Sequence, residues 1–289
     1  MSSRAHIVVV NYNAGQWLTR CLSAALACSD GPVTVVDNNS SDRSIIEARN
    51  ALGANARLRW IENKQNIGFA AANNQVLESL GEEFAVLLNP DCELNSDTLP
   101  TIIDAFDRQP KMGLAGCRVL NEDGSVEPSC KRRFPTPAAA AARMLRLQRW
   151  FPADPRFADF DYGDDVLQDE MEVVEAVSGA FMVARREAML EVGVLDAEYF
   201  MHCEDLDWCK RFALAGWQVG FISRASVIHA KGVSSASRPL RVQWALHRGM
   251  HRFFNKFDAQ NYSWVSRCAI KCGIAASFLV RAIGGLVRP

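Results

Sequence analysis

Short β-branched runs alternate with longer stretches of helical spacing through the first part of the chain. The runs have the length of buried strands, and in the stretch after each one apolar residues recur at helical intervals. This alternation predicts an α/β fold with a mostly parallel sheet and helices on both faces. The predicted strands are HIVVV (6–10), VTVVD (33–37), LRWIE (58–62) and FAVLL (84–88), and the predicted helices are 16–28, 42–51, 69–80 and 96–108.

The alternation continues after one interruption. Residues 119–127 place strand-like residues on both sides of an Asp-Gly turn, which predicts a hairpin. Residues 130–172 break the pattern, and we expect an excursion from the core there. The pattern then resumes and predicts one domain over 1–235 with a helical extension over 236–289. Its elements are strands at 172–177, 180–185, 217–222 and 226–229, and helices at 186–192, 204–216 and 238–257.

Polar residues follow each of the first four predicted strands. In open parallel sheets, ligands bind outside the carboxyl ends of the strands, so we expect these four clusters to converge on one crevice. The clusters are Asn11-Tyr12-Asn13, Asp37-Asn38-Asn39-Ser40, Asn66-Ile67-Gly68 and Asn89-Pro90-Asp91.

Composition narrows the class of protein. The 32 basic and 33 acidic residues give a formal charge of −1, so no overall basicity favours nucleic acid as a partner. The nine cysteines are odd in number and show no Cys-x-x-Cys spacing, which is typical of reduced thiols. The first strand begins too early to leave room for a leader peptide, and no run of about 18 apolar residues occurs. We therefore expect a cytoplasmic protein without a spanning helix.

Asp37 has two interpretations. It can form an Asx turn that caps the next helix, or its carboxylate can accept a hydrogen bond from the imide N–H of a uracil or thymine ring. The sequence has no Gly-x-Gly-x-x-Gly after a strand and no Gly-Lys-Ser/Thr motif, which argues against a dehydrogenase and a P-loop NTPase.

The other candidate groups also have structural alternatives. Asp91 lies in a turn or holds a divalent cation bound to a diphosphate. Glu204, Asp205 and Asp207 stabilise the start of a helix, or one of them removes a proton from an attacking hydroxyl. His229 is a surface residue at a strand end, a metal ligand, or a donor to the leaving phosphate.

The ordered set of motifs resembles the family 2 glycosyltransferases, and within them the bacterial rhamnosyltransferase-like members. The resemblance covers roughly residues 6 to 235 through VVNYN, VVDNNSSD, NIGFAAANN, LLNPDCEL, the segment 177–221 and VIHAKGVSS. It implies a GT-A fold, an inverting mechanism and Mg²⁺ or Mn²⁺ as cofactor. It implies that Asp205, beside Glu204, is the catalytic base and that Asp91 and His229 hold the metal. It also implies that the nucleotide sugar is bound by Asn11, Tyr12, Asn13, Asp37, Asn39, Asn66, Gly68, Asn89, Asp91 and Gly179.

One departure bears on the donor. Many relatives carry Asp-x-Asp where this chain has Asn89-Pro90-Asp91, and the Asn-Pro-Asp form is common among the rhamnosyltransferase-like members. The resemblance therefore favours dTDP-L-rhamnose as donor, with a UDP-hexose or UDP-N-acetylhexosamine left open. The implied acceptor is a cell-surface polysaccharide or a polyprenyl-diphosphate-linked glycan. A nucleotidyltransferase and a non-catalytic nucleotide-binding scaffold are the competing classes, although the loop at 11–15 lacks the basic residue that a nucleotidyltransferase usually has there.

The pattern of apolar and basic residues in the tail predicts that it binds a membrane surface. Wound as a helix, 267–288 separates an apolar sector from its basic residues, and no acid occurs from Ala259 onward. A second acid-free stretch, 128–153, contains six basic residues: Lys131, Arg132, Arg133, Arg143, Arg146 and Arg149. We expect both to face anionic lipid at the inner face of the plasma membrane. The alternative is that the sector packs on the catalytic domain or on a second subunit in a homodimer. The sector comprises Cys268, Cys272, Ala275, Ala276, Leu279, Ile283 and Leu286, and the basic residues are Arg267, Lys271, Arg281 and Arg288.

Overall fold

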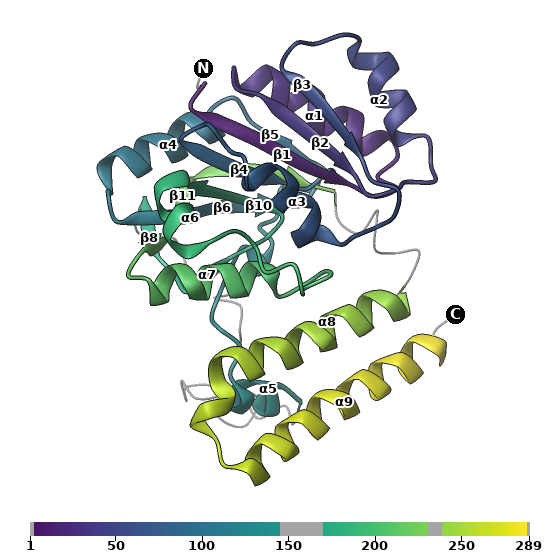
Figure 1. The fold of residues 1–289 in the computed structure, drawn as a ribbon, viewed down its shortest axis with the longest axis vertical. Helices are drawn as coiled ribbons and strands as arrows, with labels where there is room; N and C mark the ends of the chain where they lie inside the picture. The colour runs from purple at the N-terminus through teal and green to yellow at the C-terminus, as the bar shows by residue number, and fades with distance from the viewer. Residues whose placement is uncertain (1–2, 145–169, 231–238, 288–289) are drawn as a thin grey trace.

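A computed structural model of the chain describes residues 3–144, 170–230 and 239–287 (Figure 1). Within these residues the centre is a nine-stranded mixed sheet in the order β3-β2-β1-β4-β10-β6-β11-β5, with β8 paired to β11. The strands are β1 Ala5–Asn11, β2 Val33–Asp37, β3 Leu58–Glu62, β4 Phe84–Leu88, β5 Cys92–Leu94, β6 Met112–Leu120, β8 Met171–Val173, β10 Phe181–Arg185 and β11 Gln218–His229.

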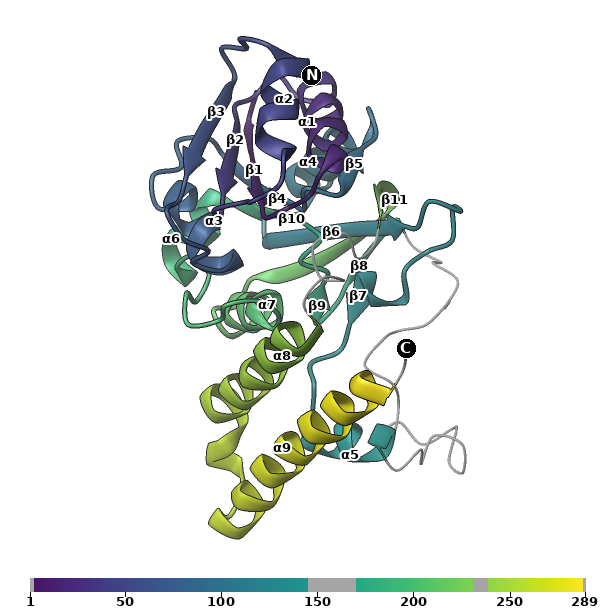
Figure 2. The same cartoon turned by 90° about the vertical axis from the view of Figure 1, so that its right-hand side faces the viewer.

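The four strands predicted first agree with the structure to within a residue at each end. They pair parallel with one another, so their carboxyl ends share one edge. Helices α1 and α2 lie on one side of this sheet, and α3 and α6 lie on the other (Figures 1 and 2). The main helices of the domain are α1 Gln16–Cys28, α2 Ser44–Leu52, α3 Phe69–Leu77, α4 Thr98–Arg108, α6 Arg186–Val192 and α7 Glu204–Leu214. The predicted α/β architecture is confirmed.

The second half of the sheet differs from a simple parallel repeat. β10 runs antiparallel to both β4 and β6, while β11 runs parallel to β6. The two strands predicted at 217–222 and 226–229 are one strand, because β11 continues through an irregularity in its pairing with β6 between Ile222 and Ser226. The predicted hairpin has its turn at Gly124, whose φ is 83°, and a bridge between Leu120 and Val126.

The central strands of the sheet are buried on both faces. Every residue of β1, β2 and β4 is buried, as expected where helices cover a parallel sheet on both sides. All nine cysteines are free, in agreement with the prediction of reduced thiols, and the seven from Cys21 to Cys209 are buried.

Two long helices form the C-terminal extension. α8 Pro239–Phe253 ends four residues earlier than predicted and is followed by a π-helical turn at Phe254–Asp258; α9 Trp264–Val287 begins three residues earlier than predicted. Two basic residues join this hairpin to the α/β domain. Arg252 and Lys256 both bond Asp196, and Lys256 Nζ also lies 2.6 Å from Asp207 Oδ2. No helix of the described part is long and apolar enough to cross a bilayer.

The prediction that 128–153 faces lipid is wrong for two of its basic residues. Lys131 is buried and its Nζ lies 2.8 Å from Glu172 Oε2, while Arg132 is paired with Asp205. Both lie in the short strand β7 Lys131–Arg132. This strand pairs with β9 Ala176–Val177, so it packs on the domain. Of the rest of this excursion, α5 Pro137–Met144 is described, whereas Arg146 and Arg149 lie outside the described residues.

Candidate active site

The first polar cluster joins β1 to β2. The two strands pair in a register that sets Asn11 beside Asp37, and Asn11 Nδ2 donates to Asp37 Oδ1 at 2.8 Å. Ser40 donates to the same carboxylate through its backbone N–H at 3.0 Å and its hydroxyl at 2.6 Å. Asp37 therefore forms a turn with Ser40, but it does not cap α2, whose N-cap is Arg43 and has no side-chain cap bond. That role does not exclude contact with a base, because a carboxylate has about four acceptor positions.

The loops beside this cluster are held in strained backbone conformations. Asn13 has φ 55° and Asn39 has φ 64°, which only glycine and a few short polar residues adopt readily. Asn13 is fixed because its Oδ1 accepts the Ser41 N–H at 2.7 Å. Asn39 is exposed and Tyr12 is half-buried, so both are accessible at the rim of the cluster.

The third cluster connects the first two to the loop that precedes α7. Asn66 Oδ1 accepts the Gly68 N–H within its own turn, and Gly68 in turn accepts a bond from Asn38 Nδ2 at 3.1 Å. Gly68 has φ 91°, and a Cβ there would lie 2.6 Å from the carbonyl oxygen of Phe200. Only glycine fits this position, which brings the 66–68 loop against residues 199–201.

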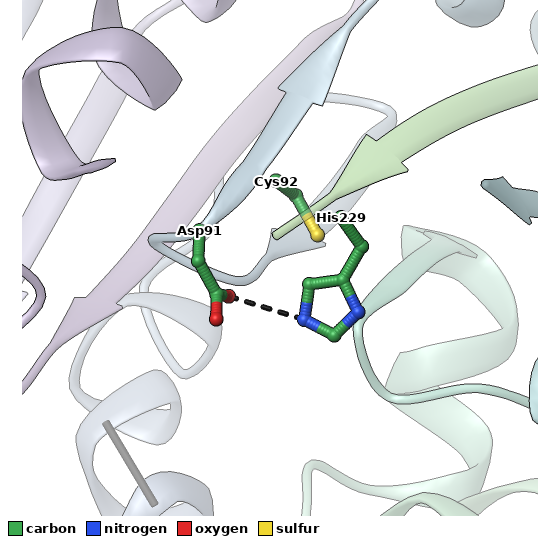
Figure 3. Close-up of side chains that lie close together, drawn as sticks. All are labelled: Asp91, Cys92 and His229. Atoms are coloured by element: carbon green, nitrogen blue, oxygen red, sulfur yellow. Dashed lines mark ion pairs between the residues drawn. The ribbon is translucent and has the colours of Figure 1, made fainter. Parts of the chain in front are cut away.

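The fourth cluster brings Asp91 to His229. β5 pairs antiparallel with the end of β11, and this sets Cys92 opposite His229. His229 Nε2 lies 3.2 Å from Asp91 Oδ1 (Figure 3). Its Nδ1 lies 2.9 Å from Glu127 Oε1. Burial lowers the pKa of His229, but the hydrogen bonds to Asp91 and Glu127 outweigh it and raise the pKa to about 9. The imidazolium thus links two buried carboxylates that are far apart in sequence, and its Nε2 must lose a proton before it can bind a metal.

This set of donors fits a divalent cation. A carboxylate oxygen of Asp91, a ring nitrogen of His229 and the sulfur of Cys92 all lie within 4.8 Å of one another. A carboxylate oxygen and an imidazole nitrogen suit Mn²⁺, and a carboxylate with phosphate oxygens suits Mg²⁺. Cys92 is a poorer ligand, because burial raises the pKa of its thiol well above the usual range and a metal ligand must be a thiolate.

Glu127 is a residue of this site that sequence reasoning missed. It lies at the end of the predicted hairpin, where an acid is unremarkable, and its side chain is almost fully buried. Its bond to Nδ1 leaves Nε2 of His229 directed at Asp91, which is the arrangement that carboxylates impose on metal-binding histidines.

Asp205 lies at the start of α7 with both of its oxygens engaged. Oδ1 accepts the Leu206 N–H at 2.8 Å, and Oδ2 accepts the Gly179 N–H at 3.0 Å and a short bond from Arg132 Nη2. Burial raises the pKa of Asp205, but the charge of and the hydrogen bond from Arg132 outweigh it and hold the pKa below its ordinary value. The carboxylate is therefore kept ionised, as a proton acceptor must be. Arg132 was missed as a site residue because its pairing with Asp205 spans 73 positions of sequence.

The two other acids of α7 differ from Asp205. Asp207 is fully buried, and its two oxygens accept bonds from Arg211 and Lys256, which identifies it as a residue that anchors the C-terminal extension. Glu204 is buried with no hydrogen-bond partner for Oε2 within the described residues, and burial followed by the charge of Asp205 raises its pKa. Two adjacent carboxyl groups thus have opposite pKa shifts, a pattern common at catalytic sites.

Residues 179 and 180 link the acid of α7 to the fourth cluster. The Gly179 N–H donates to Asp205, and the next carbonyl, that of Ala180, accepts the Asn89 N–H at 2.9 Å. A Cβ at Gly179 would lie 3.1 Å from Asp205 Oδ2, which is tighter than an ordinary contact, so a side chain there would displace the Asp205 carboxylate by a few tenths of an ångström. These contacts connect the first three clusters to one another and the fourth cluster to Asp205, and the convergence of all four on one crevice stays a prediction.

The fold and this arrangement can be compared with known proteins. A model of the family described as "Glycosyltransferase like family 2" matches residues 3–248. The chain belongs to this family. Among curated proteins, this glycosyltransferase is similar to the N-acetylglucosaminyl-diphospho-decaprenol L-rhamnosyltransferase of Mycobacterium tuberculosis, with 27% identity over 96% of this chain and 91% of the relative.

Solved structures show that this glycosyltransferase has the GT-A fold. A mannosyltransferase from Pyrobaculum calidifontis in complex with GDP-Man and Mn²⁺ matches with a TM-score of 0.58 and 16% identity over 97% of this chain and 75% of that one. GalNAc-T7 with UDP, GalNAc and Mn²⁺ matches with a TM-score of 0.59 and 14% identity over 78% of this chain, which spans 43% of that longer protein. The expected fold and family are confirmed.

A first prediction concerns the Arg132–Asp205 pair. Arg132→Met is expected to raise the pKa of Asp205, because burial then acts without an opposing charge, and so to move the acidic limb of the kcat profile to higher pH. The measurement is kcat against pH for the native enzyme and the variant, with circular dichroism to verify folding, since an unpaired buried charge costs roughly 3–5 kcal/mol. Arg132→Lys should restore most of the native profile. An acidic limb that stays in place in Arg132→Met would show that Arg132 does not control Asp205.

Proposed function

We propose that this glycosyltransferase transfers L-rhamnose from dTDP-L-rhamnose to a hydroxyl of a lipid-linked glycan precursor. The observation that carries the proposal is the near full-length similarity to the mycobacterial rhamnosyltransferase, whose name specifies a diphospho-decaprenol acceptor. The Asn-Pro-Asp form at 89–91 supports the same donor. A UDP-hexose or UDP-N-acetylhexosamine is the second candidate donor. The place of reaction would be the inner face of the plasma membrane, with the enzyme bound peripherally.

The arrangement of acids supports an inverting displacement. The acceptor oxygen attacks the anomeric carbon from the face opposite the nucleoside diphosphate, and Asp205 accepts the proton of that hydroxyl. The bond from the anomeric carbon to the phosphate oxygen breaks, and the electron pair leaves with the diphosphate. The transition state has oxocarbenium character, as in inverting glycoside hydrolysis. Arg132 and the Gly179 N–H hold Asp205 in place and ionised for this step.

Asp91 and His229 would hold Mg²⁺ or Mn²⁺ in this mechanism. When bound, the metal supplies positive charge against the departing diphosphate. Glu127 bonds Nδ1 of His229 and directs Nε2 toward Asp91. Asn11 positions Asp37, which would accept the imide N–H of the pyrimidine.

The decisive experiment is a screen of nucleotide sugars with the purified enzyme. Thermal stabilisation by each donor is measured first, and release of nucleoside diphosphate is then measured with Mn²⁺ or Mg²⁺. We expect the strongest effects with dTDP-L-rhamnose. Release of pyrophosphate would indicate a nucleotidyltransferase, and the absence of any donor turnover would indicate a non-catalytic scaffold. Preference for a UDP-sugar would select the second candidate donor.

The role of Asp37 can be separated from its role in the turn. Asp37→Ala is expected to raise the donor KM with little change in kcat, because a base contact made equally in the ground and transition states is uniform binding. The structure adds a cost in stability, since the variant also removes acceptors for Ser40 and Asn11. Ser40→Ala is the control, because it weakens the turn but leaves the Asp37 carboxylate. If Ser40→Ala raised KM as much as Asp37→Ala, or if a GDP- or ADP-sugar were preferred, the base contact would be rejected.

Glu127 gives a test of the metal site that does not require turnover. Glu127→Ala leaves Nδ1 of His229 without its partner, and loss of such a carboxylate typically lowers metal affinity by about 10–100-fold. Binding of Mn²⁺ is followed by electron paramagnetic resonance in the presence of dTDP. Glu127→Gln keeps an acceptor for Nδ1 and should bind Mn²⁺ more tightly than Glu127→Ala does. Equal Mn²⁺ affinity in the native enzyme and Glu127→Ala would mean that His229 is not a ligand.

A further inference from the structure

One face of α9 is apolar and exposed to solvent. Trp264, Val265, Leu279 and Val280 are 75%, 60%, 58% and 70% exposed, respectively. Five smaller residues on the same side are also exposed: Cys268, Ala269, Cys272, Ala275 and Ala276. At 100° per residue, these nine residues occupy a sector of about 160°. We call this sector the outer face of α9.

The opposite side of α9 is the side that packs. Phe278 lies against Trp244 and His247 of α8, with ring centroids 5.4 and 5.5 Å apart, and Ser277 Oγ lies 3.4 Å from His247 Nε2. Both views of the fold place α8 between the catalytic domain and α9 (Figures 1 and 2). The apolar sector predicted from the sequence therefore does not pack on the catalytic domain in the described residues. A contiguous apolar surface of this kind usually marks an interaction site.

The charge around the outer face has one sign. The tail carries Arg267, Lys271 and Arg281 and no acid from Ala259 onward. Two further arginines on α8, Arg241 and Arg248, are exposed and form no ion pair within the described residues. In contrast, Arg252 and Lys256 are neutralised by Asp196 and Asp207. Among the residues that the structure describes, the hairpin thus adds positive charge that no acid pairs with to an exposed apolar helix.

We propose that the outer face of α9 docks this enzyme onto the interface of an anionic membrane. An interfacial helix needs an apolar face to enter the acyl boundary and basic residues to meet anionic headgroups, and α9 has both. A second copy of the chain is a poorer occupant. A two-fold contact through this face would bring the basic residues of two tails together without an acid from either tail to pair with them.

The same hairpin contacts the loop that leads to the candidate base. A Cβ at Gly249 of α8 would lie 2.8 Å from the carbonyl oxygen of His202 and 3.2 Å from Cys203, and α7 begins at the next residue, Glu204. Docking through α9 therefore holds Asp205 on the part of the enzyme near the bilayer. This deepens the proposed function, on which it rests, because a lipid-linked acceptor would reach Asp205 from that surface.

The test uses the full-length enzyme and vesicles of phosphatidylcholine with or without phosphatidylglycerol. We expect the enzyme to sediment with the anionic vesicles and to be released only in part by high salt. The double variant Leu279→Glu/Val280→Glu should bind at least about tenfold more weakly, because it removes two apolar side chains from the contact and adds two negative charges. The matched control is Leu190→Glu, which changes a residue of α6 that is 72% exposed and should bind as the native enzyme does.

The outcomes separate this inference from the proposed function. Unchanged binding of the double variant, or no binding of the native enzyme to anionic vesicles, overturns the docking surface. The docking surface is also overturned if analytical ultracentrifugation shows that the native enzyme is a dimer and the double variant is a monomer, because a second copy would then cover the face. The enzyme could bind vesicles through α9 and yet transfer no sugar to a lipid-linked acceptor. That result would support the docking surface and reject the proposed acceptor. In the double variant, release of nucleoside diphosphate from the donor in solution should stay at the native rate.

Discussion

Asp205→Asn is expected to lower kcat at least about a hundredfold, equivalent to about 2.7 kcal/mol of transition-state stabilisation. The amide cannot accept the proton of the attacking hydroxyl. The Asn side chain still offers an oxygen to the Gly179 N–H or to Arg132, but Arg132 loses its counter-charge, so circular dichroism is needed to verify folding. The measurement is single-turnover transfer from the preferred donor, with nucleotide binding measured in parallel. Nucleotide binding should change little, since Asp205 contacts the 179–180 loop rather than the Asp37 cluster.

Glu204→Gln is the matched control for this experiment. Glu204 adjoins Asp205, but burial raises the pKa of Glu204, so at neutral pH its carboxyl group is poorly suited to act as a base. We expect a much smaller loss of kcat in Glu204→Gln than in Asp205→Asn. The assignment would be reversed by near-normal transfer in Asp205→Asn combined with a large loss in Glu204→Gln. Asp207 is not a candidate, because its side chain is fully buried, whereas Asp205 is 8% exposed, and because it pairs with both Arg211 and Lys256.

Asp91→Asn should lower kcat by a similar factor and should differ from Asp205→Asn in binding. It removes the charged ligand of the proposed metal site, so the affinity for dTDP in the presence of Mn²⁺ should fall, whereas affinity without metal should stay the same. Calorimetry of dTDP with and without Mn²⁺ makes the comparison. The asparagine can still accept a bond from His229 Nε2, so the pairing of β5 with β11 should survive. Metal-dependent nucleotide binding that is unaffected in Asp91→Asn would remove Asp91 from the metal site.

The first half of the fold follows closely from local patterns. Strands such as 84–88 are continuous apolar runs because helices cover the sheet on both faces, and such runs are visible in one sequence. The second half was harder to predict. β7 is only two residues long, and β11 passes through an irregularity that divides its pattern into two apparent strands.

The site was predictable to the extent that its residues follow strand ends. Asn11 and Asp37 are predictable because parallel neighbours end at the same edge, and the register indeed sets them side by side. Glu127 and Arg132 were not predictable. Glu127 bonds a partner 102 positions away, and Arg132 bonds a partner 73 positions away. Neither residue has a local pattern that distinguishes it from an ordinary surface charge.

The sequence by itself determined the family, the parallel half of the sheet and the polar clusters, because these depend on short-range periodicity and on motifs in a fixed order. Only the tertiary structure decided which charges are paired. Basic residues that look alike in sequence have different surroundings in the structure. Arg132 is buried against Asp205 and Lys256 is bonded to Asp207. Arg281 is exposed on α9. The physical reason is that the free energy of a charge depends on its burial and on its partner, and long-range packing sets both.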